Sequence, residues 1–114
     1  MFLMRAGGKL VRDRIPEIIR RNGEEPVSYV ADASEYRQRL RDKLSEETDE
    51  FLQADGEIAK EELADVLEVV QALARNLGMT LDDLERLRAS KAAERGGFEN
   101  RIIWMNKVGG EGRE

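Results

Sequence analysis

Residues 44–70 read LSEETDEFLQADGEIAKEELADVLEVV, and this stretch carries two pairs of acids with the same spacing. The first pair is Glu47 and Glu50, and the second is Glu62 and Asp65. In a helix, residues three positions apart lie side by side on one face. The stretch therefore predicts two helices, each with a pair of carboxylates on one side.

Apolar residues surround one acid of each pair. With about 100° of rotation per residue, apolar side chains cluster within about 60° on either side of Glu47 and of Glu62. Around Glu47 they are Tyr36, Leu40, Leu44, Phe51 and Ala54, and around Glu62 they are Ile58, Val66, Val69, Leu73 and Leu77. Glu50 and Asp65 lie at the edges of these arcs, and Glu46 lies outside its arc. Each helix thus places one acid in its apolar face and one at the rim.

An acid in an apolar face needs a partner. An ionised carboxylate there loses hydration worth several kcal/mol unless something compensates. The chain has no histidine, and Lys43 is the nearest cation on the first helix. Carboxylate oxygens are the ligands that Mg²⁺ and Mn²⁺ prefer. We therefore expect the two helices to pack together around a divalent metal ion.

The connection between the two acidic helices is very short. The first is predicted over residues 35–54, the turn falls at residues 55–56, which are Asp and Gly, and the second helix follows over residues 57–77. Helices joined so closely form an antiparallel hairpin, in which the end of the first lies beside the start of the second. All four acids are then expected at the same level of an all-α fold.

Shorter elements precede the hairpin. Pro16 suits the first turn of a helix that ends at residues 22–23, which are Asn and Gly. Residues 26–30 alternate like a short strand, an interpretation that we leave open. Asp32 or Ser34 can cap the first acidic helix. This region also holds a group of cations, either a solvated helix end or a cluster that faces phosphate: Lys9, Arg12, Arg14, Arg20 and Arg21.

A third long helix is predicted after the hairpin. Thr80 can cap its start, and residues 96–97, both Gly, end it. Lys91 and Arg95 are four positions apart, so both cations point the same way. They are either an idle, exposed pair of like charge or a phosphate-binding pair. Residues 98–108 contain Trp104 and are expected to dock onto the rest of the chain.

The size and charge of the chain narrow the classes of function. A chain of 114 residues is expected to form a single domain, here residues 1–108 with a polar tail at 109–114. A domain this small often gains stability from self-association. The net charge of −5 argues against binding to duplex DNA or an acidic membrane. Without cysteine or a long apolar run, the cytoplasm is the expected location.

Four stretches together resemble the MazG superfamily of nucleotide pyrophosphohydrolases. They are KLVRDRIP at 9–16, EETDE at 46–50, EELADVLE at 61–68 and KAAERGGF at 91–98. In this order they are similar to the small single-domain branch, described as house-cleaning or phosphoribosyl-ATP pyrophosphohydrolase-like enzymes. The resemblance covers residues 9–103. It implies helical hairpins that assemble into a four-helix core across a dimer or a higher oligomer.

The resemblance also implies an activity and a set of site residues. The expected reaction is Mg²⁺-dependent cleavage of a nucleoside triphosphate, with a non-standard nucleotide favoured, to the monophosphate and pyrophosphate. By position, the expected metal ligands are Glu47, Glu50, Glu62 and Asp65. Glu46 or Glu47 would orient or deprotonate the attacking water. Lys91 and Arg95, together with Lys9 and Arg12, would hold the phosphates.

Two other functions remain open at the level of sequence. One is a true phosphoribosyl-ATP pyrophosphohydrolase of histidine synthesis, which would use the same metal site. The other is a helical dimerisation module without catalytic activity, whose acids are merely solvated. The second alternative requires Glu47 and Glu62 to face outward. The orientation of these two side chains is therefore the decisive structural observation.

Overall fold

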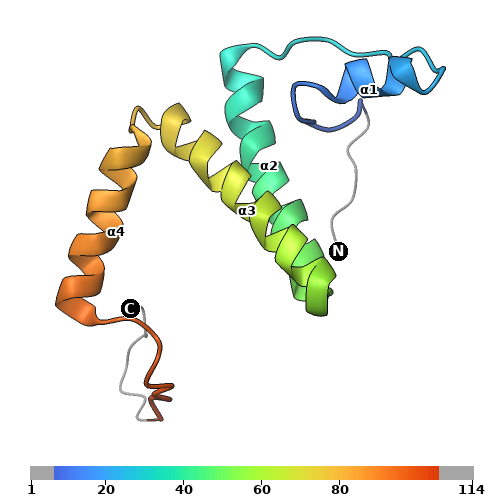
Figure 1. Ribbon diagram of the computed structural model, residues 1–114. Coiled ribbons are helices and arrows are strands. Elements are labelled where there is room, and N and C mark those ends of the chain that lie inside the picture. The colour runs from blue at the N-terminus through green and yellow to red at the C-terminus, as the bar shows by residue number, and fades with distance from the viewer. Residues whose placement is uncertain (1–6, 106–114) are drawn as a thin grey trace. The chain divides into compact units, whose positions relative to one another are not determined.

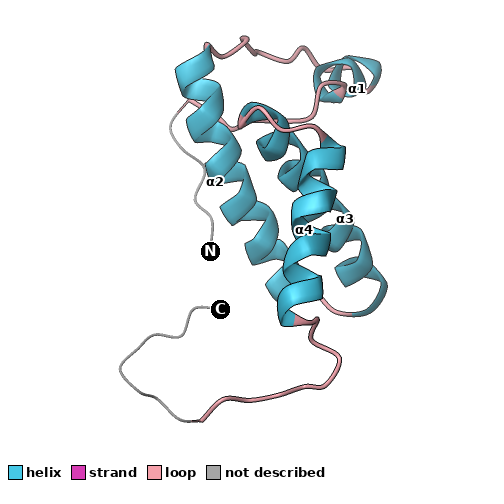
Figure 2. Ribbon diagram, turned by 90° about the vertical axis from the view of Figure 1, so that its left-hand side faces the viewer, coloured by secondary structure: helices cyan, strands magenta, loops and turns pink. Residues whose placement is uncertain are grey.

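The computed structural model describes residues 7–105, and within them the chain is all-α (Figure 1). The helices are α1 (Ile15–Arg21), α2 (Ala33–Leu52), α3 (Gly56–Asn76) and α4 (Leu81–Arg95). Figure 2 shows only helices and loops across the described residues. The predicted fold class is confirmed, and each predicted helix exists with its ends displaced by one or two residues, as is usual for frayed termini.

Contacts along the chain separate two compact units, one that ends at Leu81 and one that begins at Asp82. The first unit contains α1, α2 and α3, and the second contains α4 after its first residue. The interpretation of residues 1–108 as a single domain stays a prediction, and the tail at 109–114 lies outside the described residues. In residues 7–105, no helix is long and apolar enough to span a membrane.

Helices α2 and α3 pack against each other as the predicted hairpin. The Asp32 side chain caps α2 by accepting a hydrogen bond of 2.8 Å from the Glu35 backbone N–H. Three residues connect α2 to α3, and Gly56 has a φ of +61°, in the left-handed region that glycine enters without a steric penalty. The short turn therefore fixes the antiparallel arrangement.

The hairpin core is small, and acids form part of it. Among the described residues, the buried apolar side chains are Leu40, Val69 and Ala74, whereas the buried charged ones are Glu46 and Glu47. Only 4% of Glu46 and 7% of Glu47 is exposed. Buried ionisable residues are rare unless they are paired. The centre of the hairpin is consequently a place where charges must be compensated.

The structure decides the open interpretation of residues 26–30 and contradicts the expected docking over residues 98–105. Residues 24–32 contain no strand, and Val27 and Val30 are exposed, so the alternating pattern at 26–30 is not matched by pairing with another strand. Residues 98–105, the described part of the segment expected to dock, form no helix or strand. Their large apolar side chains are exposed: Phe98, Ile102, Ile103, Trp104 and Met105. The rest of that segment, 106–108, lies outside the described residues.

Candidate metal centre

Three of the four predicted ligands come together between α2 and α3. Glu47 of α2 and Glu62 and Asp65 of α3 each offer a carboxylate oxygen, and these oxygens all lie within 4.8 Å of one another. The hairpin achieves this because its short turn brings the second half of α2 beside the first half of α3. Three converging carboxylates are a ligand set that suits Mg²⁺ or Mn²⁺.

Two carboxylate oxygens in this group are buried and have no hydrogen-bond partner among the described residues. They are Oε1 of Glu47 and Oε1 of Glu62. A buried polar atom without a partner costs about 1–3 kcal/mol, and more when it is charged. The predicted inward orientation of Glu47 and Glu62 is therefore confirmed. A divalent cation at this position would satisfy both oxygens at once.

The remaining predicted ligand, Glu50, lies beside the group. Its residue is largely exposed and falls outside the three that converge. Its carboxylate nevertheless loses part of its hydration, and this loss, together with the nearby charges of Glu62 and Glu46, raises the pKa of Glu50. Burial likewise raises the pKa of Glu47, against the hydrogen bond from Lys43 that lowers it, and the charges of Glu50 and Asp65 raise it further. Both shifts are those of acids that lack sufficient positive charge nearby.

Glu46, by contrast, has two ammonium partners. Lys9 Nζ donates to Oε2 at 2.9 Å, and Lys43 Nζ donates to Oε1 at 3.1 Å. Burial raises the pKa of Glu46, but the hydrogen bonds from Lys9 and Lys43 outweigh it and leave the pKa below its usual value. The role predicted for Glu46 in orienting water stays a prediction, and its contacts make it an anchor for two lysines.

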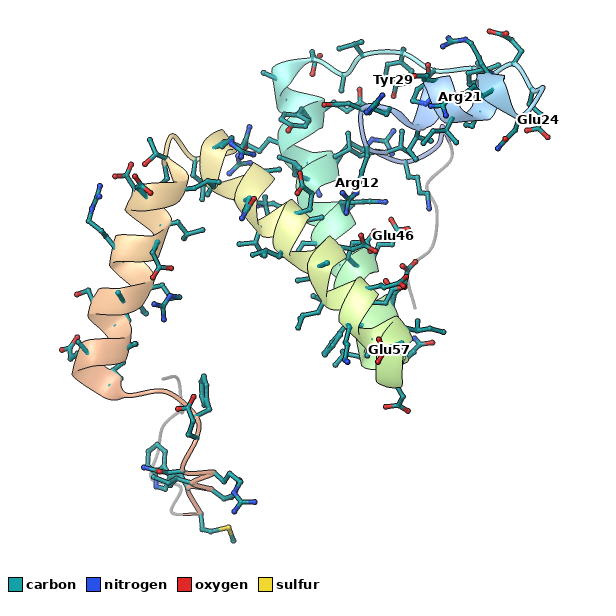
Figure 3. The ribbon with its side chains drawn as sticks, viewed as in Figure 1. Arg12, Arg21, Glu24, Tyr29, Glu46 and Glu57 are labelled. Atoms are coloured by element: carbon teal, nitrogen blue, oxygen red, sulfur yellow. The ribbon has the colours of Figure 1, made fainter. Side chains whose placement is uncertain are left out.

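Two of the cations predicted to bind phosphate contact the acids directly. Lys9 bonds Glu46, and Arg12 Nη2 donates to Oδ1 of Asp65 at 2.6 Å. Figure 3 shows Arg12 and Glu46 on the same side of the hairpin. The Gly8 carbonyl accepts a third bond, 2.7 Å long, from Arg39. Residues 8–12 thus form a basic strap that is tied to the hairpin at three points, and Arg12 shares Asp65 with the candidate metal centre.

The other two predicted phosphate ligands lie in the second unit. Lys91 and Arg95 are exposed on α4. Their assignment to phosphate binding stays a prediction.

Sequence reasoning missed the role of Lys43. It noted this lysine only as the nearest cation, but Lys43 is largely buried and contacts both buried glutamates. The signal was present in the spacing, because Lys43 precedes Glu46 by three residues and Glu47 by four, positions that meet on a helix. The partners of Lys9 and Arg12 lie 37 and 53 residues away, and no local pattern indicates such pairs.

Comparisons with known proteins identify one partial relative. A 47-residue segment of the chain is 49% identical to an uncharacterized protein of Mycolicibacterium smegmatis. The match covers 41% of this chain and 48% of that relative, so the chain spans about half the length of the protein that it resembles. No protein-family profile matches the chain, and no solved structure matches it significantly.

Proposed function

We propose that the chain is a Mg²⁺-dependent pyrophosphohydrolase that cleaves a nucleoside triphosphate to the monophosphate and pyrophosphate. The observation that carries the proposal is a pair of buried oxygens, from Glu47 and Glu62, within a group of three carboxylates. Neither oxygen has a hydrogen-bond partner in the described part of the chain. The resemblance of four sequence stretches to the MazG superfamily supplies the reaction and the substrate class. In the alternative without catalysis these acids would face solvent, and their burial argues against it.

The residues at the hairpin centre fit the proposed metal ion. Glu47, Glu62 and Asp65 would hold it. The resemblance adds Glu50 as a further ligand, and the charge of Glu62 acts on its pKa. When bound, Mg²⁺ would supply positive charge that neutralises the phosphate oxygens and would make water a stronger nucleophile. The acid-rich setting supplies the excess of negative charge that a divalent ion requires.

The chain's own residues would orient the water that is consumed. The water oxygen forms the new P–O bond while the bridging P–O bond between the α and β phosphates breaks. The proton of the water passes to a carboxylate. Of the two candidate bases, Glu46 is the weaker, because the hydrogen bonds from Lys9 and Lys43 outweigh its burial and lower its pKa. We therefore assign the orientation of water to Glu47, whose pKa burial raises.

Cations at the rim would hold the phosphates. Arg12 lies against Asp65 and is half exposed, so it can exchange the carboxylate for a phosphate oxygen without moving far. Lys9 is committed to the buried Glu46, which makes it the less mobile of the two. Lys91 and Arg95 are proposed as further phosphate ligands on the basis of the resemblance.

Self-association would complete the fold of the hairpin. The described part of the hairpin exposes large apolar side chains from both helices: Leu52, Ile58, Leu63, Leu67 and Leu77. A monomer this small rarely leaves so many apolar side chains in water without a partner. A second hairpin packed on them would give the four-helix core that the resemblance implies.

A screen for pyrophosphate release tests the proposed activity. The substrates would include standard and modified nucleoside triphosphates and phosphoribosyl-ATP, each with Mg²⁺ and with a chelator. Phosphoribosyl-ATP as the preferred substrate would favour the histidine-pathway alternative. We expect Mg²⁺-dependent release that is abolished in Glu47→Gln and Asp65→Asn, because each variant removes a ligand charge.

The matched control for this screen is Glu61→Gln, which removes an exposed carboxylate next to Glu62. It should retain full activity. Release by Glu47→Gln and Asp65→Asn at the wild-type rate would remove both residues from the centre. No release from any nucleotide, with circular dichroism showing intact helices, would refute the proposed activity.

A further inference from the structure

Lys43 is a buried lysine that joins two buried acids. Its side chain is 15% exposed, and its Nζ lies 3.1 Å from Oε1 of Glu46 and 3.3 Å from Oε2 of Glu47. All three residues belong to α2, so the contacts span a single turn of helix. A lysine loses much side-chain entropy and hydration when it is buried. The buried position of Lys43 therefore lowers stability unless its ammonium is paired with an acid.

The contact to Glu47 determines where its other oxygen points. A carboxylate is planar, so an ion pair that holds Oε2 also restricts rotation of the group and limits the directions that Oε1 can take. In Glu47, Oε2 faces Lys43, and Oε1 is the buried atom for which residues 7–105 provide no hydrogen-bond partner. One oxygen of Glu47 lies within the group formed with Glu62 and Asp65. Lys43 therefore holds the side of Glu47 that is turned away from the unsatisfied position.

Lys43 differs from the two cations of the basic strap, Lys9 and Arg12, in the acid that it holds. Arg12 bonds Asp65, a member of the group itself, and would compete with a metal ion for that carboxylate. Lys9 bonds Glu46, which is not one of the three converging acids. Lys43 is bonded to Glu47 but leaves Oε1 available. Partners that orient a ligand through its second atom commonly tune metal affinity by 10- to 100-fold, a magnitude from other metal sites.

We propose that Lys43 is a positioning residue of the metal centre, which holds Glu47 by Oε2 so that Oε1 faces Glu62 and Asp65. This inference rests on the proposed metal site. A positioning role and simple charge repulsion predict opposite effects of removing Lys43 on metal affinity. A cation close to a metal ion repels it, so removal of a merely neighbouring charge should strengthen metal binding. Removal of a positioning lysine should weaken it.

Direct titration with Mn²⁺ tests the inference without any substrate. Free Mn²⁺ is followed by its electron paramagnetic resonance signal for the wild type, Lys43→Met and Lys43→Arg. We expect Lys43→Met to bind Mn²⁺ roughly 10-fold or more weakly, and Lys43→Arg to recover most of the loss. The control is Lys60→Met, which removes an exposed lysine paired with the exposed Glu57 of the first turn of α3, and it should leave the affinity unchanged.

A double variant separates positioning from neutralisation of charge. Lys43→Met leaves Glu46 with one lysine in place of two and can destabilise the hairpin, whereas Lys43→Met combined with Glu46→Gln restores the wild-type net charge. If Lys43 positions Glu47, the double variant still binds Mn²⁺ weakly although its helices are intact by circular dichroism. Wild-type affinity in the double variant would overturn the inference.

Two different outcomes separate the role of Lys43 from the metal centre itself. Unchanged or tighter Mn²⁺ binding by Lys43→Met, with binding lost in Glu47→Gln, would overturn the role of Lys43 and leave the metal centre standing. The absence of saturable Mn²⁺ binding by the wild type would overturn the metal centre and, with it, the role of Lys43.

Discussion

Replacement of Arg12 by glutamine should tighten the binding of a divalent metal ion. In the structure, Arg12 Nη2 lies 2.6 Å from Oδ1 of Asp65, so this carboxylate already has a cationic partner. An ion that takes Asp65 as a ligand must displace the guanidinium or share the carboxylate with it. The variant Arg12→Gln removes the competing charge and keeps a polar side chain of similar length.

The exposure of the two side chains sets the size of the effect. Arg12 is 55% exposed and Asp65 is 40% exposed, so solvent screens their attraction strongly. Exposed ion pairs contribute about 0.2–1 kcal/mol, which corresponds to a gain in metal affinity of about 1.4- to 5-fold. Because salt screens exposed charges, the gain should shrink as ionic strength rises.

Isothermal titration with Mn²⁺ at low and at high salt measures the change. The matched control is Arg14→Gln, which removes an exposed cation of the same segment whose ion pair, with Glu17 at 3.7 Å, lies outside the acid group. The reasoning is refuted if Arg12→Gln weakens Mn²⁺ binding, because Arg12 would then support the centre. An equal gain in Arg14→Gln would show that only net charge matters.

Three further predictions concern stability, ionisation and assembly. Leu40 is only 2% exposed, so Leu40→Ala should lower the free energy of unfolding by about 2–5 kcal/mol in urea denaturation. A smaller loss would show that this core is not tightly packed. The hydrogen bond from the Tyr29 hydroxyl, and to a smaller extent the one from Arg39, lower the pKa of Glu35. Glu35 therefore stabilises the fold above the pKa that it has in the unfolded chain, and this stabilisation is lost as the pH falls through its folded pKa. Tyr29→Phe should raise that pKa toward its ordinary value in a carbon-13 titration, and an unmoved pKa would contradict the contact. Leu67→Lys should shift the protein to smaller species in sedimentation if the exposed face of α3 associates.

Local pattern was sufficient to predict the hairpin. The period of the apolar residues, the cap and the short turn depend on neighbours in the chain. The structure confirms both helices and the turn, and of the two candidate caps it selects Asp32 over Ser34. The inward orientation of Glu47 and Glu62 followed from the same period, because a helix with a known apolar face has a known register. Most of the candidate centre was thus accessible from sequence.

Longer-range features were not accessible in the same way. The alternating residues 26–30 show a pattern that fits a strand, but a strand also needs a pairing partner, and the described chain gives them none. Trp104 and the apolar residues beside it suggested burial, but composition does not say which surface covers a segment. Their exposure in this chain is a property of the tertiary structure alone.

The sequence by itself determined two helices with carboxylates turned toward each other, since helical period and turn length are encoded within a few residues. Only the tertiary structure decided which cations from distant parts of the sequence pair with those carboxylates. Lys9 and Arg12 reach Glu46 and Asp65 across 37 and 53 residues because the strap folds back along the hairpin. Charge acts through space, and the separation of two charges in space is set by the path of the whole chain.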